Sequence, residues 1–83
     1  MGQIKHQVLL TKIANRIKEL RSQKEVAQEA FYNDTNIHLA RIETGRNNIS
    51  VSTLNAICEY FDISLVDFFK EINLPPDKSH KHQ

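Results

Sequence analysis

The sequence is poor in the residues that mark several large classes of protein. It contains one cysteine, Cys58, and only two glycines, two prolines and no tryptophan. A lone cysteine excludes an internal disulfide bond. No apolar run approaches the roughly 18 residues that a membrane span needs, and Val8–Leu10 is too short for the apolar region of a signal peptide. We therefore expect a cytoplasmic protein.

The residues that do occur favour one compact helical domain. The chain has 83 residues, of which 40% are hydrophobic and 25% charged. A chain of this length builds a single core, and scarce glycine and proline fit helices better than a β-rich fold. The expected domain spans 1–76, because Pro75 and Pro76 end regular structure and the polar segment 77–83 has the composition of a disordered tail.

Groups that support catalysis or metal binding are also scarce. There is no glycine-rich phosphate loop and no serine, histidine and aspartate constellation, so we expect no enzyme. Cys58 is in phase with Leu54 and Phe61, which favours a small core residue over a nucleophile. His80 and His82 fall short of the four ligands of a structural zinc site. We predict no metal and no other cofactor.

Charge is distributed unevenly along the chain although the net charge is only +1. Residues 1–24 are basic, with Glu19 as their one acidic side chain, whereas residues 59–77 are acidic, with Lys70 as their one basic side chain. Such a chain could bind a polyanion with one face and a second copy of itself with another. An ordinary solvated surface gives the same pattern.

Apolar spacing predicts helices over most of the chain. The stripe Leu10, Ile13, Ile17 and Leu20 predicts a helix from about Gln7 to Gln23. No strong breaker lies between residues 21 and 32, so local propensity would let this helix continue through 25–27. Residues 33–36 are turn formers, and a short helix through Leu39 and Ile42 should end at Gly45.

Two serines mark the starts of the last two helices. Ser50 can cap a helix with the buried stripe Val51, Leu54, Ile57, Cys58 and Phe61. Ser64, with Asp67 three residues on, forms a weaker capping box before a helix that carries Leu65, Phe68, Phe69 and Ile72. The expected fold is all-α, with five helices.

Several motifs in this order resemble the phage-repressor family of Cro/repressor-like, or XRE-type, helix-turn-helix proteins. The resemblance covers about residues 10–72. It is carried by Arg16-Ile17-Lys18-Glu19-Leu20-Arg21, Gln28-Glu29, Arg41-Ile42-Glu43-Thr44-Gly45 and the apolar helix that Ser50 opens. The resemblance implies a domain whose second and third helices form the DNA-binding unit, with the third entering the major groove.

The resemblance also implies roles for individual residues. Gln28 would meet a phosphate at the start of the second helix, and Arg46, Asn47 and Asn48 would touch phosphates after the third. The alternative for Gln28 is a solvated side chain without a DNA contact, and the alternative for residues 46–48 is an ordinary polar surface loop. The resemblance pairs Glu43 with Arg21 as a structural ion pair, so Glu43 has no predicted DNA contact.

The third helix carries the candidate base-reading residues. His38 and Arg41 are three residues apart and share one helix face, while Leu39 and Ile42 point toward the core. Arginine can bond guanine with two hydrogen bonds, and histidine can donate or accept at a base edge. A phosphate contact for Arg41 and a plain surface position for His38 are the alternatives. Thr35 and Asn36, just before this helix, complete the candidate DNA contacts.

The sequence departs from the family pattern in three places. Glu25 and Ala27 stand where members commonly carry glycine and serine or threonine. Asn36 replaces the usual turn glycine, which asparagine can do because it tolerates positive φ. The stretch from Gln28 to Glu43 is about three residues short, and the missing residues fall at the start of the third helix. These departures affect the mode of DNA reading more than the fold.

The last predicted helix carries more apolar surface than one narrow face can bury. Neighbours Phe68 and Phe69 point about 100° apart on a helix, so one should face the core and the other a partner. We expect a homodimer through Leu65, Phe69 and Ile72, with Phe69 and Ile72 nearer the partner. A wide core-facing stripe in a monomer is the alternative.

These features together predict a sequence-specific transcriptional regulator, a repressor that binds a palindromic operator on double-stranded DNA as a homodimer. No small-molecule ligand or membrane partner is expected. Two other functions remain open. One is a helical interaction module that has lost DNA binding, and the other is an antitoxin or the controller of a restriction system.

Overall fold

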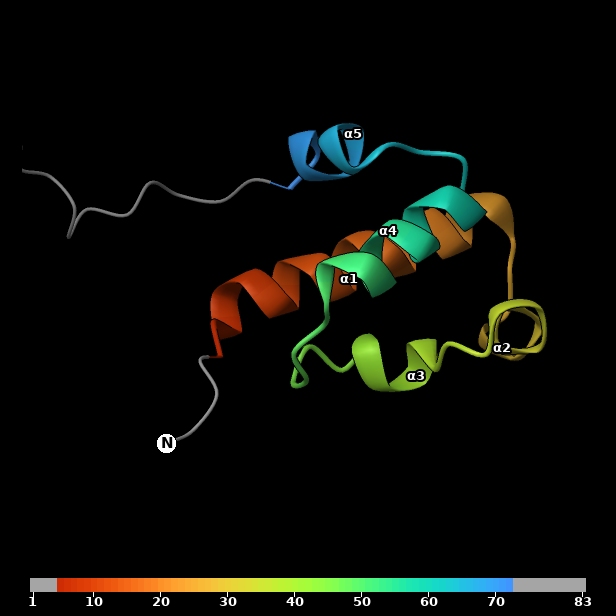
Figure 1. Cartoon of the computed structure of the whole chain (residues 1–83), viewed down its shortest axis with the longest axis horizontal. Coiled ribbons are helices and arrows are strands. Elements are labelled where there is room, and N and C mark those ends of the chain that lie inside the picture. Colours follow the sequence, from red (N-terminus) through yellow and green to blue (C-terminus); the bar gives the residue numbers. More distant parts are fainter. Residues whose placement is uncertain (1–4, 73–83) are drawn as a thin grey trace, which may run out of the picture.

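The computed structural model describes residues 5–72, which form five helices and no strand. They are α1 (Gln7–Lys24), α2 (Gln28–Thr35), α3 (Leu39–Ile42), α4 (Val51–Tyr60) and α5 (Leu65–Lys70), as Figure 1 shows. The all-α fold predicted from the sequence is confirmed. The predicted tail, 77–83, lies outside the described residues.

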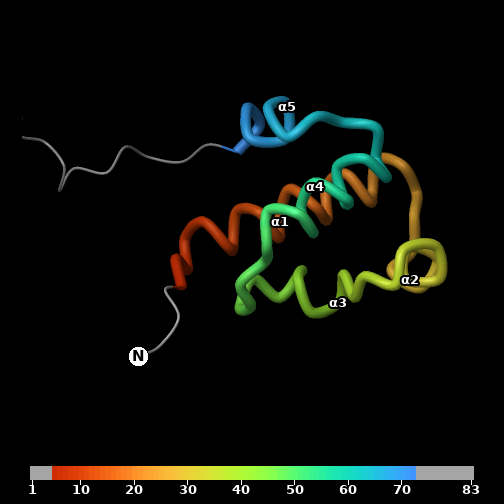
Figure 2. The backbone as a smooth tube through the Cα atoms, in the orientation of Figure 1, coloured from red at the N-terminus to blue at the C-terminus, as the bar shows by residue number. Residues whose placement is uncertain are grey.

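One hydrophobic core joins all five helices. Its buried members come from every helix and from the segments beside α4 and α5: Ile13, Ile17, Leu20, Phe31, Leu39, Leu54, Ile57, Cys58, Phe61, Phe68 and Ile72. In the view of Figure 2, α2 and α3 lie on one side of α1 and α4, and α5 lies on the other. The fold therefore separates the helix-turn-helix segment from the last helix.

The break between α1 and α2 occurs where the sequence carries no glycine or proline. Glu25 adopts a left-handed conformation, with φ 57° and ψ 46°, and ends α1 after Lys24. The amide of Val26 donates to the carbonyl of Arg21 at 3.0 Å. This bond satisfies a carbonyl that the helix end would leave open. The predicted helix from about Gln7 to Gln23 agrees with α1, and the left-handed cap at Glu25 explains the break that local propensity could not place.

The other helix ends follow the sequence signals more closely. The side chains of Ser50 and Ser64 accept from the amides of Thr53 and Asp67, both at 3.0 Å, as predicted. Residues 33–35, predicted as a turn, form the last turn of α2, and the chain reverses at Asn36, whose φ is 66°. Each serine stabilises its helix by satisfying one open amide.

One residue of the predicted core is misplaced. Val51 is 72% exposed, whereas the other four residues of that stripe are buried. Val51 is the first residue of α4, and the buried residues of this helix begin only with Leu54. The expectation that Val51 is buried is wrong.

A hydrogen bond also ties the end of α2 to α4. The Tyr60 hydroxyl donates to Asp34 Oδ2 at 2.7 Å, and this hydrogen bond raises the Tyr60 pKa. The Tyr60 ring packs on Phe31, with ring centroids 4.4 Å apart. Phe31 is fully buried, so the aromatic contact fixes α2 against the core.

We predict that Glu25→Gly stabilises the protein. A left-handed conformation costs an L-residue about 1–2 kcal/mol, and the added freedom of glycine in the unfolded chain offsets part of this. Unfolding in urea should show a gain of about 0.5–1 kcal/mol. Asn36→Gly is the control and should gain less, because asparagine already tolerates positive φ. Equal gains at both positions would contradict the argument.

Candidate nucleic-acid interface

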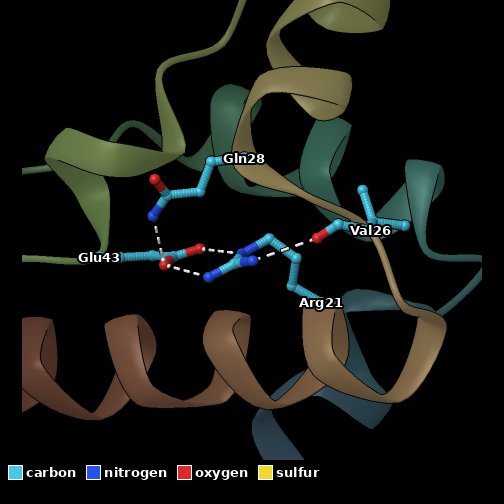
Figure 3. Close-up of polar contacts among 4 residues, drawn as sticks. All are labelled: Arg21, Val26, Gln28 and Glu43. Carbon is cyan, nitrogen blue, oxygen red and sulfur yellow. Dashed lines mark hydrogen bonds and ion pairs between the residues drawn. The ribbon is translucent and has the colours of Figure 1, made fainter.

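An ion pair joins α1 to the end of α3. Arg21 Nε donates to Glu43 Oε2 at 2.8 Å, and Arg21 Nη2 donates to Glu43 Oε1 at 2.9 Å (Figure 3). The two parallel bonds are the paired geometry that arginine makes with carboxylates. The Glu43 side chain is only 4% exposed and that of Arg21 is 24% exposed. The predicted pair is confirmed.

Further hydrogen bonds extend this pair to the start of α2. Gln28 Nε2 donates to Glu43 Oε1 at 2.8 Å, and Arg21 Nη1 donates to the carbonyl of Val26 at 3.1 Å. The hydrogen bond to Glu43 is the main cause that raises the Arg21 pKa, because it favours the charged guanidinium. We name Arg21, Val26, Gln28 and Glu43 the clamp. The clamp fixes both ends of the α2–α3 unit to α1.

Gln28 lies at the first position of α2, where the resemblance places a phosphate contact. Figure 3 shows its side-chain amide directed at Glu43, and the hydrogen bond between them is partly buried. In this structure the side chain serves the clamp. A phosphate contact by Gln28 stays a prediction, and it would have to coexist with the bond to Glu43 or replace it.

The third helix is as short as the sequence predicts. It has four residues, of which Leu39 is buried and Ile42 packs against the core. Arg41 is exposed, and among the ion pairs of the described residues none involves its guanidinium. His38, also exposed, is the N-cap residue of α3. The two candidate reading side chains are therefore on the surface and accessible.

Two of the candidate DNA contacts have structural bonds of their own. Thr35 Oγ1 donates to the carbonyl of Phe31 at 2.8 Å and accepts from the amide of Ile37 at 3.1 Å, which shapes the turn before α3. Asn47 Nδ2 donates to the carbonyl of Arg41 at 3.2 Å, at the C-terminal end of α3. Both residues position the backbone of the predicted DNA-binding surface.

The loop after α3 is held close to α1. Gln7 Nε2 donates to the carbonyl of Gly45 at 2.7 Å. Gly45 has a φ of 73°, and a Cβ there would lie 3.2 Å from the Cα of Thr11, so both conformation and space favour glycine. The left-handed conformation expected of Gly45 is present, but α3 ends earlier than predicted, at Ile42, with Glu43 as its C-cap. The exposed loop residues Arg46 to Asn48 therefore follow a backbone position that is held against α1.

All candidate DNA contacts come from one side of the molecule. Asn36 is exposed between α2 and α3, and the other candidates lie on those helices or on the loop that follows. Figure 1 shows these segments on the side of α1 and α4 opposite α5. The fold thus gathers into one surface residues that the sequence spreads over 28–48.

The predicted partner-facing residues of α5 are only partly exposed. Phe68 is fully buried and Phe69 is 40% exposed, as the helix geometry predicts for neighbours. Ile72 is 9% exposed and belongs to the core, so its expected place nearer a partner is wrong. Leu65 is half-buried. Val66, which sequence analysis overlooked, is 68% exposed and adds to the apolar surface.

The described residues contain no group of histidine, cysteine, aspartate and glutamate side chains suited to hold a metal ion. Cys58 lies in the core, and burial raises the pKa of its thiol. Within residues 5–72 no helix is long and apolar enough to cross a membrane. His80 and His82 lie outside the described residues.

The short helices α2 and α3, joined by a turn and fixed to α1, define a helix-turn-helix protein. The model of the Cro/C1-type HTH DNA-binding domain matches residues 16–73, more than half of the chain, and the protein belongs to this family. The resemblance noted in the sequence is thereby confirmed. Neither the search of curated proteins nor that of solved structures found a match. The family supports a DNA-binding regulator, and its domains are typically not enzymes.

We predict that the Arg21–Glu43 pair is strongly coupled. Arg21→Ala leaves a buried carboxylate with Gln28 as its remaining side-chain partner and should cost about 3 kcal/mol of unfolding free energy. Glu43→Ala leaves a guanidinium that reaches water and should cost about 1–3 kcal/mol. The double variant should lose at least about 1 kcal/mol less than the sum of the single losses. Urea unfolding of all four proteins measures this.

The Arg16–Glu19 pair provides a control on the same helix. Its Nη1 to Oε1 distance is 2.6 Å, and although the Arg16 side chain is only 11% exposed, the Glu19 carboxylate side chain is 58% exposed. Exposed pairs three residues apart couple by about 0.5 kcal/mol or less. Equal coupling energies for the two pairs would show that the clamp contributes no more than a surface pair.

Proposed function

We propose that the protein is a sequence-specific transcriptional repressor that binds a palindromic operator as a homodimer. The observation that carries the proposal is the surface of α3, where exposed His38 and Arg41 stand on a short helix anchored by the clamp. A rigid helix with polar, outward side chains suits entry into the major groove. Repression requires only that the operator be occupied.

Reading of the operator rests on few side chains in this proposal. Arg41 donates two hydrogen bonds to a guanine edge, and His38 and Asn36 contact neighbouring bases. Arg46 and the loop through Asn48 meet backbone phosphates and fix the register. With four residues in α3, base contacts are limited, so DNA shape carries part of the specificity.

A two-fold dimer explains why the operator would be palindromic. Each subunit then reads one half-site, and the spacing of the half-sites follows the spacing of the two α3 helices. Val66 and Phe69 supply exposed apolar surface on α5, away from the proposed DNA-binding side. A partner seated there leaves α3 accessible.

We predict that Arg41→Ala relaxes the preference at one base pair of each half-site. Removal of a base contact should cost about 1–3 kcal/mol of operator binding. A randomised-site selection on parent and variant side by side measures the information at every position. Identical motifs from the two proteins would show that Arg41 reads no base.

Arg46→Ala is the control for Arg41→Ala, because it removes one positive charge from a residue that is proposed to contact phosphate and not a base. It should weaken all sequences alike and reduce the slope of log affinity against log salt by about 0.9 for each phosphate that the variant no longer neutralises. Gln28→Ala, which also removes a hydrogen bond from the clamp, should weaken all sequences alike but leave the slope unchanged, because glutamine carries no charge. Absence of salt-dependent binding by the parent would favour the interaction module over the regulator.

We predict that Phe69→Glu prevents dimer formation. A charge placed at the centre of an apolar contact loses its hydration on association. Sedimentation at tens of micromolar should show a dimer for the parent and a monomer for the variant. Val8→Glu, which changes a valine that is 51% exposed on α1, is the control and should remain dimeric. A monomeric parent would contradict the proposed homodimer.

A further inference from the structure

Tyr32 and His38 lie face to face across the turn between α2 and α3. Their ring centroids are 4.3 Å apart and their planes meet at 26°. This separation is shorter than that of most aromatic pairs, and the small angle indicates stacking. Tyr32 is half-buried on α2, whereas His38 is exposed. The tyrosine ring is thus a support beneath a histidine that remains accessible.

No hydrogen bond or ion pair orients the His38 side chain within the described residues. As the N-cap residue of α3 it makes no side-chain hydrogen bond to the helix amides. Its carbonyl accepts from the amides of Arg41 and Ile42 at 3.2 and 3.4 Å, and these bonds fix the backbone but not the imidazole ring. An unrestrained side chain loses conformational entropy when it binds. Stacking on Tyr32 reduces that loss, because the His38 ring is already ordered before DNA binds.

The pair also borders a shallow hollow between α2 and α3. The hollow is lined by Gln28, Glu29, Tyr32, His38, Leu39 and Ala40. It opens between the two helices that the family uses to contact DNA. The Tyr32 ring on α2 thus lies beside His38, the N-cap residue of the four-residue helix α3.

We propose that Tyr32 is a positioning residue for DNA reading, which holds the His38 imidazole in place for a base contact. The stacked pair replaces part of the surface that a longer α3 would supply. The proposal rests on the proposed DNA-binding function. The aromatic ring is the part required, since the Tyr32 hydroxyl makes no hydrogen bond within the described residues.

A double-mutant cycle on operator binding tests this role. His38→Ala should lower the affinity of the parent for its selected operator about tenfold, the size expected for one base contact. In a Tyr32→Leu background the same change should cost less than about twofold, because the imidazole is no longer held there. Both changes should relax the selected motif at the same base pair. If the parent binds DNA but the losses of affinity from His38→Ala and Tyr32→Leu simply add, the role of Tyr32 is overturned. The proposed DNA-binding function is not affected by that result.

Two variants separate positioning from general stability. Tyr32→Phe keeps the ring and should bind with parental affinity and the parental motif. Tyr60→Leu removes the other tyrosine, which contacts Phe31 and Asp34 and is not among the rings that stack on His38. It should lower the melting temperature without changing the base preference. A relaxed motif in Tyr60→Leu, or in Tyr32→Phe, would overturn the proposal.

A measurement on the free parent covers the case in which Tyr32→Leu does not fold. Nuclear Overhauser contacts should join the His38 ring protons, assigned by their disappearance in His38→Ala, to the Tyr32 ring protons. Their absence in a folded parent would overturn the proposal. Failure of the parent to bind any DNA sequence would overturn the proposed function, and the role of Tyr32 with it, even if the rings are in contact.

Discussion

The arrangement of the helix-turn-helix depends on one buried carboxylate. Glu43 ends α3, and its oxygens accept from Arg21 on α1 and from Gln28 at the start of α2. A buried carboxylate without such donors would cost several kcal/mol, so the three segments have to meet at this point. Because these hydrogen bonds attach both α2 and α3 to α1, the turn between α2 and α3 needs little stability of its own. A four-residue helix, too short to be stable alone, can then present side chains at fixed positions.

The elements that follow from periodicity and capping could be predicted from the sequence. Leu10, Ile17 and Leu20 specify the buried face of α1, and Ser50 and Ser64 mark the starts of α4 and α5 because each satisfies an open amide. The Arg21–Glu43 pair followed from the family resemblance and not from spacing, since the two residues are 22 positions apart. Long-range polar contacts of this kind leave no periodic signal.

What could not be predicted involves backbone strain and contacts across a turn. Glu25 adopts a left-handed conformation without the glycine that usually marks it, so helix propensity gave no signal for the end of α1. The Tyr32–His38 stack joins two helices across a turn, and neither residue belongs to a recognisable motif. Ile72 was misplaced because periodicity places a residue on a helix face but does not tell a core contact from a partner contact.

The turn between α2 and α3 brings the surface of α2 close to the reading helix. Only three residues separate the end of α2 at Thr35 from the start of α3 at Leu39, so side chains of α2 lie within contact distance of the N-terminal end of α3. Tyr32 occupies that place and packs on His38. Because His38 is also the N-cap of α3, a ring fixed on α2 restrains the point from which the whole reading helix starts. In the proposed role of Tyr32, the cost of ordering this surface is met on folding and not on binding, which matters most where base contacts are few.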